Sequence, residues 1–204
     1  MVSQLNTQLQ PPVGAHDHVR GARTALISLV EYGDFECPYC RAAVGIVNGL
    51  LQVLGDQLSF TFRHFPMREV HPHAQHAAEV AEAAAAQGHF WEMHDRLFAG
   101  QNALDDLSLV GYARELDLDA EAVAQELAEQ TFAARVEEER KGGVASGVTG
   151  TPTFFIDGLR YDGSVSLPKL LSAIRQRHPD VHVGEIQTET ARIPRIRWPR
   201  EEER

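Results

Sequence analysis

The sequence is poor in three features that would place it in a specialised class of protein. It has only two cysteines in 204 residues, so it cannot carry the disulfide framework of a small secreted scaffold. Its apolar runs are short, Ala25–Val30 being typical, and none approaches the roughly 18 residues of a membrane-spanning helix. Lys and Arg number 19 against 29 Asp and Glu, and the net charge of −10 argues against binding to nucleic acid or anionic lipid.

The amino terminus also lacks the parts of a secretory signal peptide. Residues 1–10 contain no Lys or Arg and no apolar h-region. We therefore expect a cytoplasmic protein, in a compartment where thiols are normally held reduced. With 204 residues the chain can bury a full core, either as one large domain or as two small ones.

The first third of the chain predicts a strand, a helix and a second strand. The apolar run at 26–32 is typical of a strand buried on both faces. After Cys40, apolar residues recur with the 3.6-residue period of a helix, which Gly55 would end. Residues 58–63 alternate between apolar and polar side chains, as a strand does. Elements of these lengths in this order predict a βαβ unit with parallel strands.

The middle of the chain predicts helices only. We expect helical stretches at about 74–87, 89–98, 108–116, 120–130 and 131–145. Strand character returns at 153–156, and Asp157 and Gly158 predict a two-residue hairpin turn into a further strand. Ser166 is expected to cap a final helix.

These patterns divide the chain into four parts. We expect an extended lead-in at 1–24, a β-containing domain made of 25–70 and 148–178, a helical insert at 71–147, and a charged tail at 179–204. The tail contains three prolines. It is expected either to have no fold of its own or to be ordered only by packing against something else.

The two cysteines lie in the motif Cys37-Pro38-Tyr39-Cys40, where the first strand ends and the first helix begins. As a staple, the pair would close a loop of only two residues and constrain little of the unfolded chain. Pro38 suits the first turn of a helix, because its missing N–H would have no partner there. Cys37 would then be the N-cap, where unpaired backbone N–H groups and the helix dipole stabilise a thiolate. Cys37 is therefore predicted to be the nucleophile, and Cys40, one turn deeper, to resolve the mixed disulfide.

A metal site would need two ligands beyond the cysteines. A Cys2His2 finger places about 12–15 residues between the second cysteine and the first histidine, whereas 23 residues separate Cys40 from His64. His71, His73 and His76 could take up a metal opportunistically, but we interpret them as solvated residues at the start of an exposed helix. The sequence therefore predicts a redox centre and no metal site.

A second motif, GVTGTPTFFIDG at 147–158, enters a strand directly after Pro152. Together with Cys-Pro-Tyr-Cys it resembles the thioredoxin superfamily, in which a cis-proline loop faces the cysteines. The helical insert and three further stretches narrow the resemblance to DsbA-like domains, which bacteria carry alone or fused to sodium/proton antiporters. The stretches are DHVRG at 17–21, LVEYGDFECPYC at 29–40 and GHFWEMHDRLF at 88–98.

The resemblance covers about residues 15–178 and implies a fold and an activity. The fold would be α/β, a thioredoxin fold with an all-helical insert between the second and third core strands. The protein would be an enzyme, a DsbA-like thiol–disulfide oxidoreductase that exchanges disulfides with protein or peptide substrates. Its redox-active disulfide would join Cys37 to Cys40, with no further cofactor. Its partners would be protein or peptide thiols and disulfides and a redox partner, with no nucleic acid and no membrane insertion.

The resemblance also implies how substrate is held. Thr151 and Pro152 would contact an extended substrate backbone beside the sulfurs. Pro38 and Tyr39, between the cysteines, would contact substrate as well. We further expect the Thr151–Pro152 peptide bond to be cis and to lie against the cysteine pair.

Two more polar residues have open roles. Glu31 stands six residues before Cys37, where DsbA-like proteins carry a buried acid beneath the active site. It is expected to relay the Cys40 proton; the alternative is that it ends a strand in contact with solvent. His64 is expected to be an ordinary strand-end residue, and a role near the site is the alternative.

Other functions stay open at this point. The scaffold could serve as a redox sensor or binding module, with the cysteines as a switch. A glutathione-dependent transferase or isomerase is a further alternative, but those relatives generally lack the second cysteine, so Cys40 counts against it. The dipeptide Pro-Tyr departs from the Pro-His of the periplasmic oxidant and the Gly-Pro of thioredoxin. The direction of electron flow is therefore open: the missing signal peptide favours a reductase and the family an oxidase.

Overall fold

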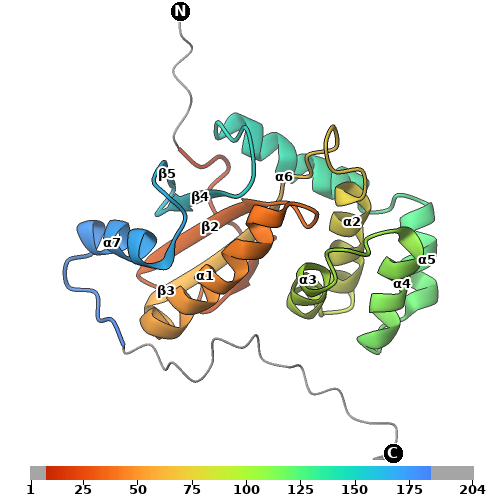
Figure 1. The fold of residues 1–204 in the computed structure, drawn as a ribbon, viewed down its shortest axis with the longest axis horizontal. Helices are drawn as coiled ribbons and strands as arrows, with labels where there is room; N and C mark the ends of the chain where they lie inside the picture. The colour runs from red at the N-terminus through yellow and green to blue at the C-terminus, as the bar shows by residue number, and fades with distance from the viewer. Residues whose placement is uncertain (1–7, 185–204) are drawn as a thin grey trace, which may run out of the picture.

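The structure, a computed structural model, describes residues 8–184 (Figure 1). Five strands form one sheet in the order β1-β3-β2-β4-β5. The strands are β1 His18–Arg20, β2 Ile27–Gly33, β3 Leu58–His64, β4 Thr153–Ile156 and β5 Leu159–Tyr161. The helices within the described part of the chain are α1 Pro38–Leu54, the short 3-10 helix η1 Gly55–Gln57, α2 Ala74–Ala86, α3 Phe90–Ala99, α4 Asp106–Glu115, α5 Ala120–Ala128, α6 Ala133–Ala145 and α7 Leu167–Arg177.

The central part of the sheet is the predicted strand–helix–strand unit. β2 and β3 run parallel and are joined by α1, which begins at Pro38 and ends at Gly55. Gly55 has a φ of 53°, a backbone conformation that favours glycine. β4 adds antiparallel to the other side of β2 and turns into β5 through Asp157 and Gly158, both with positive φ. The predicted α/β thioredoxin-type fold class is confirmed.

The sheet contains one strand that the sequence did not predict. β1 lies in the segment interpreted as an extended lead-in, and it pairs antiparallel with β3. The residues before β1 cover the polar face of β3, because the Arg63 guanidinium donates to the Asp17 carboxylate at 2.7 and 2.9 Å and to the carbonyls of Pro11 and Pro12. Both faces of β3 are therefore buried, although its sequence alternates.

The helices α2 to α6 follow β3 and precede β4, in the order that the sequence predicted. Figure 1 shows α2, α3, α4 and α5 gathered beside one end of the sheet, while α1 lies across one of its faces. α2 was expected to be exposed, but most of its residues are buried because its alanines pack against α3, α5 and α6. The expected exposure of this helix was wrong. The proposed domain bounds at 25–70, 148–178 and 71–147 stay a prediction.

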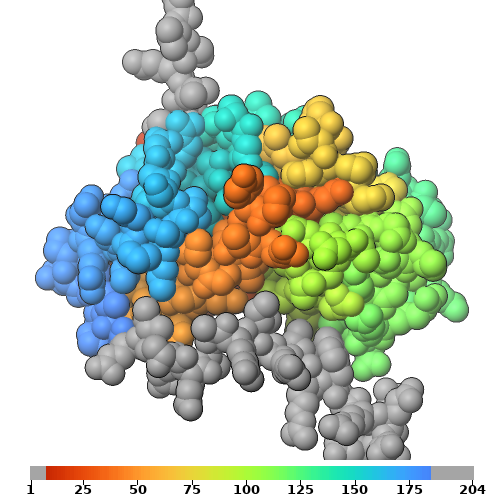
Figure 2. Space-filling view, viewed as in Figure 1, coloured from red at the N-terminus to blue at the C-terminus, as the bar shows by residue number. Residues whose placement is uncertain are grey.

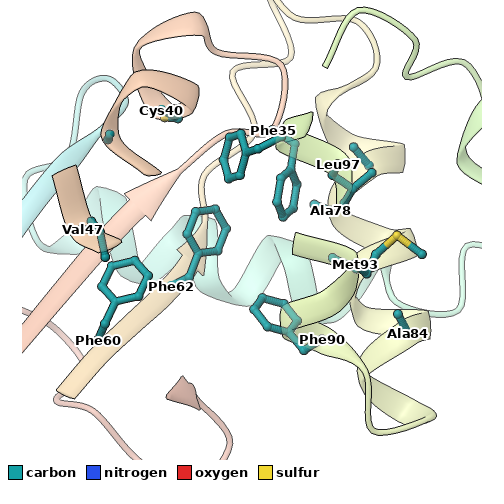
Figure 3. Close-up of a cluster of buried hydrophobic side chains, with 14 of the residues drawn as sticks. Phe35, Cys40, Val47, Phe60, Phe62, Ala78, Ala84, Phe90, Met93 and Leu97 are labelled. Carbon is teal, nitrogen blue, oxygen red and sulfur yellow. The ribbon is translucent and has the colours of Figure 1, made fainter. Parts of the chain in front are cut away.

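The hydrophobic core is continuous between the sheet and the helical part of the molecule. Figure 3 shows Phe35 between Phe62 of β3 and helix α3, which carries Phe90 and Leu97. The ring of Phe35 lies 5.2 Å from that of Phe62 and 5.0 Å from that of Phe98. Phe35 belongs to the loop that precedes the cysteines, so this loop is anchored in both parts of the core.

The carboxyl-terminal end differs from the expectation in detail. Ser166 occupies the N-cap of α7, but its side chain makes no capping hydrogen bond. Most of the predicted tail at 179–204 lies outside the described residues. Within its described part, Gly184 N–H donates to the Val53 carbonyl at 2.7 Å, and the backbone at His182 exchanges hydrogen bonds with Gln57.

No helix in residues 8–184 is long and apolar enough to cross a bilayer.

Candidate active site

The two cysteines lie at the amino terminus of α1, directly after the loop that follows β2. Cys37 is the N-cap residue, with an extended backbone, and Pro38 is the first residue of the helix. The side chain of Cys37 is 4% exposed, and Cys40 is fully buried. Pro38 and Tyr39 face solvent, Tyr39 being 73% exposed. Figure 2 shows this orange segment reaching the surface between the yellow and green helical part and the cyan and blue carboxyl-terminal part.

The environment of Cys37 favours its thiolate. Interaction with the Cys40 thiol lowers the pKa of Cys37 to about 5, against the opposing effect of burial. The Thr151 side chain and the backbone N–H groups of Cys40 and Tyr39 lower it further. The two backbone N–H groups are the unpaired donors expected at the amino terminus of α1, so the arrangement stabilises negative charge on this sulfur.

Cys40 has the opposite environment. Burial raises its pKa well above the ordinary thiol value, and the hydrogen bond to Cys37 and the negative charges of Glu31 and Cys37 raise it further. The backbone N–H of Asp34 donates to Cys40 Sγ at 3.5 Å. Cys40 is therefore held as a thiol beneath a neighbouring thiolate, and both cysteines are free in this structure.

Glu31 lies inside the protein in the middle of β2. It is 3% exposed, so the alternative of a strand end in contact with solvent is wrong. Burial raises the pKa of Glu31 to about 8, with a further contribution from the Cys37 charge, while interaction with Cys40 opposes the shift. Within the described part of the chain, its Oε1 has no hydrogen-bond partner. The carboxyl group is thus protonated at neutral pH, next to the buried sulfur.

The loop before β4 lies against Cys37. The Thr151–Pro152 peptide bond is cis, and the Cys37 thiol donates to the Thr151 carbonyl at 3.4 Å. β4 pairs with β2, which brings Thr153 opposite Tyr32, two residues before the cysteine loop. Thr151 and Pro152 are both partly exposed, so a substrate can reach this loop beside the sulfur.

The comparisons with known proteins agree with this geometry. A family model described as thioredoxin matches residues 14–176. The chain belongs to the thioredoxin family. It is 47% identical over 174 residues to the sodium/proton antiporter NhaA 1 of Salinispora arenicola, a match that covers 85% of this chain and 26% of the antiporter. The chain therefore spans about a quarter of the length of the curated relatives it matches.

Solved structures place this thioredoxin-family chain with the DsbA proteins in fold. Oxidised BdbD from Bacillus subtilis has a TM-score of 0.75 at 20% identity, covering 84% of this chain and 97% of BdbD. A thioredoxin-like oxidoreductase from Silicibacter pomeroyi has a TM-score of 0.72 at 25% identity, covering 81% and 94%. The alpha-DsbA1 protein of Wolbachia pipientis has a TM-score of 0.71 at 19% identity, covering 83% and 94%. The sequence resemblance to DsbA-like proteins is confirmed at the level of fold.

Two carboxylates near the cysteines were missed by the sequence analysis. Asp34, buried directly after β2, accepts hydrogen bonds from the backbone N–H groups of Glu36 and Met67 and from His71 Nδ1. The Glu36 carboxylate accepts from the N–H of His73 at 2.7 Å. These contacts tie the cysteine loop to the segment between β3 and α2. His71 was interpreted as a solvated histidine; it is partly buried and paired.

Gln101, in the connection between α3 and α4, is the third residue that the sequence analysis missed. Its side-chain amide donates to the carbonyls of Phe35 and Cys37 at 2.7 and 2.9 Å. It therefore links the helical part to the backbone of Cys37, the predicted nucleophile. An isolated glutamine in a connecting segment carries no sequence signal for such a role, because the contact spans more than sixty residues.

His64 belongs to a buried network of charged side chains. His64 Nε2 lies 2.9 Å from Glu82 Oε1, and the His64 N–H donates to Glu139 at 2.6 Å. These three side chains present atoms close enough together to hold a metal ion. Both carboxylates already have basic partners, however, because Arg135 lies 2.7 Å from Glu139 and His18 lies 2.8 Å from Glu82. We interpret the group as an ion-pair network that joins β1, β3, α2 and α6.

Proposed function

We propose that this chain is a thiol–disulfide oxidoreductase that exchanges disulfides with protein or peptide substrates. The observation that carries the proposal is the opposite shift of the two thiol pKa values, with Cys37 lowered to about 5 and Cys40 raised. Such a pair offers one sulfur that attacks or leaves easily and one that is protected until it is needed. The family membership and the fold support the same activity.

The surface around Cys37 suits an extended peptide. Tyr39 is exposed next to the sulfur, and Thr151 and Pro152 form a partly exposed edge on its other side. A substrate backbone lying along this edge would add to the start of β4 in the manner of β-augmentation. We propose that Pro38, Tyr39, Thr151 and Pro152 hold the substrate, and that no cofactor beyond the cysteine pair is used.

We propose that the pair oxidises substrate dithiols. One substrate thiolate attacks Cys37 Sγ of the Cys37–Cys40 disulfide; the new bond joins substrate to Cys37, and Cys40 leaves. The second substrate thiolate then attacks the substrate sulfur of this mixed disulfide, and Cys37 leaves as a thiolate. Two electrons pass from the substrate to the pair, and a disulfide-containing redox partner removes them again. A low leaving-group pKa speeds the second step, which supports this direction.

The first step needs a proton at Cys40, because a buried sulfur with a raised pKa is a poor leaving thiolate. Glu31 is protonated at neutral pH and interacts with Cys40. We propose that Glu31 gives its proton to Cys40 as that sulfur leaves. In the reduced protein Glu31 regains a proton from solvent, because its pKa is about 8 when both cysteines are free. When the redox partner reoxidises the pair, Glu31 releases that proton to solvent and accepts the one from Cys40.

The proposal is tested with two single substitutions. In Cys40→Ser the Cys37 thiolate can still attack a substrate disulfide, the reverse of the proposed oxidation, but no second protein thiol is left to displace the bound substrate. Covalent complexes with disulfide-containing protein substrates should therefore accumulate on a non-reducing gel. Cys37→Ser is expected to trap nothing and to lose turnover by at least about 10²-fold in a peptide dithiol oxidation assay. The reason is that only Cys37 lies at the helix terminus and within reach of substrate.

Two outcomes contradict the proposal. If Cys37→Ser traps partners and Cys40→Ser does not, the roles of the sulfurs are reversed. If the unmodified protein shows no turnover with dithiol or disulfide peptides, the chain is not an oxidoreductase, and the alternative of a redox sensor or binding module gains support. A control variant, Ser172→Ala on α7, keeps both cysteines and should behave as the unmodified protein.

A further inference from the structure

The backbone of Asp34 hydrogen-bonds to both cysteines. Its side chain hydrogen-bonds to the segment between β3 and α2. Its carbonyl accepts from the Cys37 N–H at 3.1 Å, and its N–H donates to Cys40 Sγ. Its carboxylate accepts from the Glu36 N–H at 2.7 Å and the Met67 N–H at 2.8 Å. Asp34 therefore fixes the position of the cysteine loop.

This arrangement has an electrostatic cost. The Asp34 side chain is fully buried, and it lies in the loop that carries the nucleophile. A buried carboxylate near a sulfur disfavours the thiolate, because like charges repel strongly where water is excluded. The residues between the cysteines, Pro38 and Tyr39, carry no positive charge that would offset it.

His71 supplies a positive charge next to the Asp34 carboxylate. Its Nδ1 lies 2.8 Å from Asp34 Oδ2, and its side chain is partly buried at the edge of the site. Although this burial opposes the charged form, the hydrogen bond and charge of Asp34, together with the charges of Cys37 and Glu36, raise the pKa of His71. The three acidic groups that act on His71 are thus Asp34, Cys37 and Glu36.

We propose that His71 is a positioning residue whose protonated ring neutralises Asp34, so that this carboxylate can hold the cysteine loop without opposing the Cys37 thiolate. This inference rests on the proposed disulfide exchange and assigns it one more residue. In chains with a histidine between the cysteines, a cation would stand beside the sulfur directly; here the charge comes from the segment between β3 and α2.

The test compares His71→Gln with the matched control His76→Gln. His76 also pairs with an aspartate through Nδ1, at 2.6 Å from Asp106, but that aspartate lies on α4. The titration of Cys37 in the reduced protein is followed by thiolate absorbance and by alkylation rate. His71→Gln is expected to raise the titration midpoint by about one pH unit, as the loss of a nearby opposite charge does. His76→Gln is expected to leave the midpoint unchanged.

A double substitution separates charge from lost contact. Asp34→Asn combined with His71→Gln removes both charges, and the midpoint should return toward that of the unmodified protein. If His71 were only a packing residue, the double variant would titrate no lower than His71→Gln alone. Should the double variant not fold, His71→Lys keeps the charge and is expected to titrate within a few tenths of a pH unit of the unmodified protein.

The inference is overturned if His71→Gln leaves the midpoint where it is, or moves it no further than His76→Gln does. It is also overturned if neither the double variant nor His71→Lys restores the midpoint. Failure of the proposed function looks different, because the unmodified protein would then show no peptide turnover while the Cys37 titration could still be measured. The two failures are therefore distinguishable.

Discussion

Glu31 is a buried carboxyl group whose protonation is coupled to both cysteines. With a pKa of about 8 it holds its proton through the neutral range, although an exposed glutamate would have lost it near 4.5. Burial likewise disfavours the thiolate of Cys40 and raises its pKa. A proton can therefore move between the two groups at little cost in charge separation.

From this we predict the effect of Glu31→Gln. The glutamine keeps the size of the side chain but has no proton to give, so departure of Cys40 from the disulfide should slow by about 10²-fold, the lower end of the usual acid–base contribution. The slowed step is measured as mixed-disulfide formation with a peptide dithiol in stopped flow. The dependence of this step on the titration of Glu31, whose pKa burial raises, should also disappear.

The control for this prediction is Glu79→Gln. Glu79 is equally buried, but it lies on α2 and hydrogen-bonds to Gln75. It should leave the rate and its pH profile unchanged. An unaltered rate in Glu31→Gln would assign the proton transfer to another group, and a matching loss in Glu79→Gln would show a general effect of buried carboxylates on the fold.

Among single residues, the sequence predicts those whose role depends on their neighbours in the chain. Cys37 could be placed at the helix terminus because Pro38 follows it, and the Thr151–Pro152 loop could be placed beside it by resemblance. Asp34 and Gln101 could not be found in this way, because their hydrogen bonds reach segments more than thirty residues away. Only the folded chain brings these partners together.

Among the elements, α6 carries a feature that local preference alone does not explain. Gly142 and Gly143 lie within this helix, where glycine costs helix stability. The structure gives the reason, because both are buried where α6 crosses the sheet. A methyl group at Gly143 would lie 2.6 Å from the Phe65 ring and 3.1 Å from that of Tyr32. Close packing of α6 on the sheet therefore requires the absence of a side chain.

We predict that Gly143→Ala lowers the free energy of unfolding by about 1–3 kcal/mol, as overpacking does, even though alanine is the better helix former. Gly111→Ala on α4 is the matched control, since nothing lies within 4 Å of its added methyl group. It should raise stability by up to about 1 kcal/mol. Denaturant unfolding measures both, and a stabilised Gly143→Ala would contradict the packing argument.

Element prediction succeeded where the pattern is strongly periodic and failed where it is short or uniform. α1 and the parallel strands follow from regular apolar spacing. β1 has three residues and polar neighbours, so its pairing with β3 is decided by tertiary contacts. α2 was misjudged because a run of alanines gives little contrast between its faces, and alanine packs closely when other helices surround it.

For the whole molecule, the shifted pKa of Cys37 links redox state to folding. A thiol whose pKa falls from 9.0 when unfolded to about 5 when folded adds no stability below pH 5. Its contribution grows as the pH rises from about 5 to 9, where the unfolded chain binds more protons, and is constant above that. The oxidised protein has no such thiolate. Stabilising the reduced form in this way makes the disulfide the stronger oxidant, which fits the proposed direction.

We therefore predict that the stability of the reduced protein relative to the oxidised protein rises with pH between about 5 and 9. At about 1.4 kcal/mol per pH unit, the stability of the reduced protein rises by no more than roughly 5 kcal/mol over this range. Solvent at the edge of the site screens the thiolate and makes this gain smaller.

The entropy of closing the small disulfide loop does not depend on pH. It therefore shifts the difference in stability between the two forms without changing how that difference varies with pH. Burial of Glu31 destabilises both forms as the pH rises from 4.5 toward 8, but the Cys37 charge adds to this shift only in the reduced form and makes the expected rise smaller. Denaturant unfolding of both forms across this range measures the difference, and reduced Cys37→Ser should lose the rise. A difference that stays flat, or falls as the pH increases, would show that the folded state does not stabilise the Cys37 thiolate.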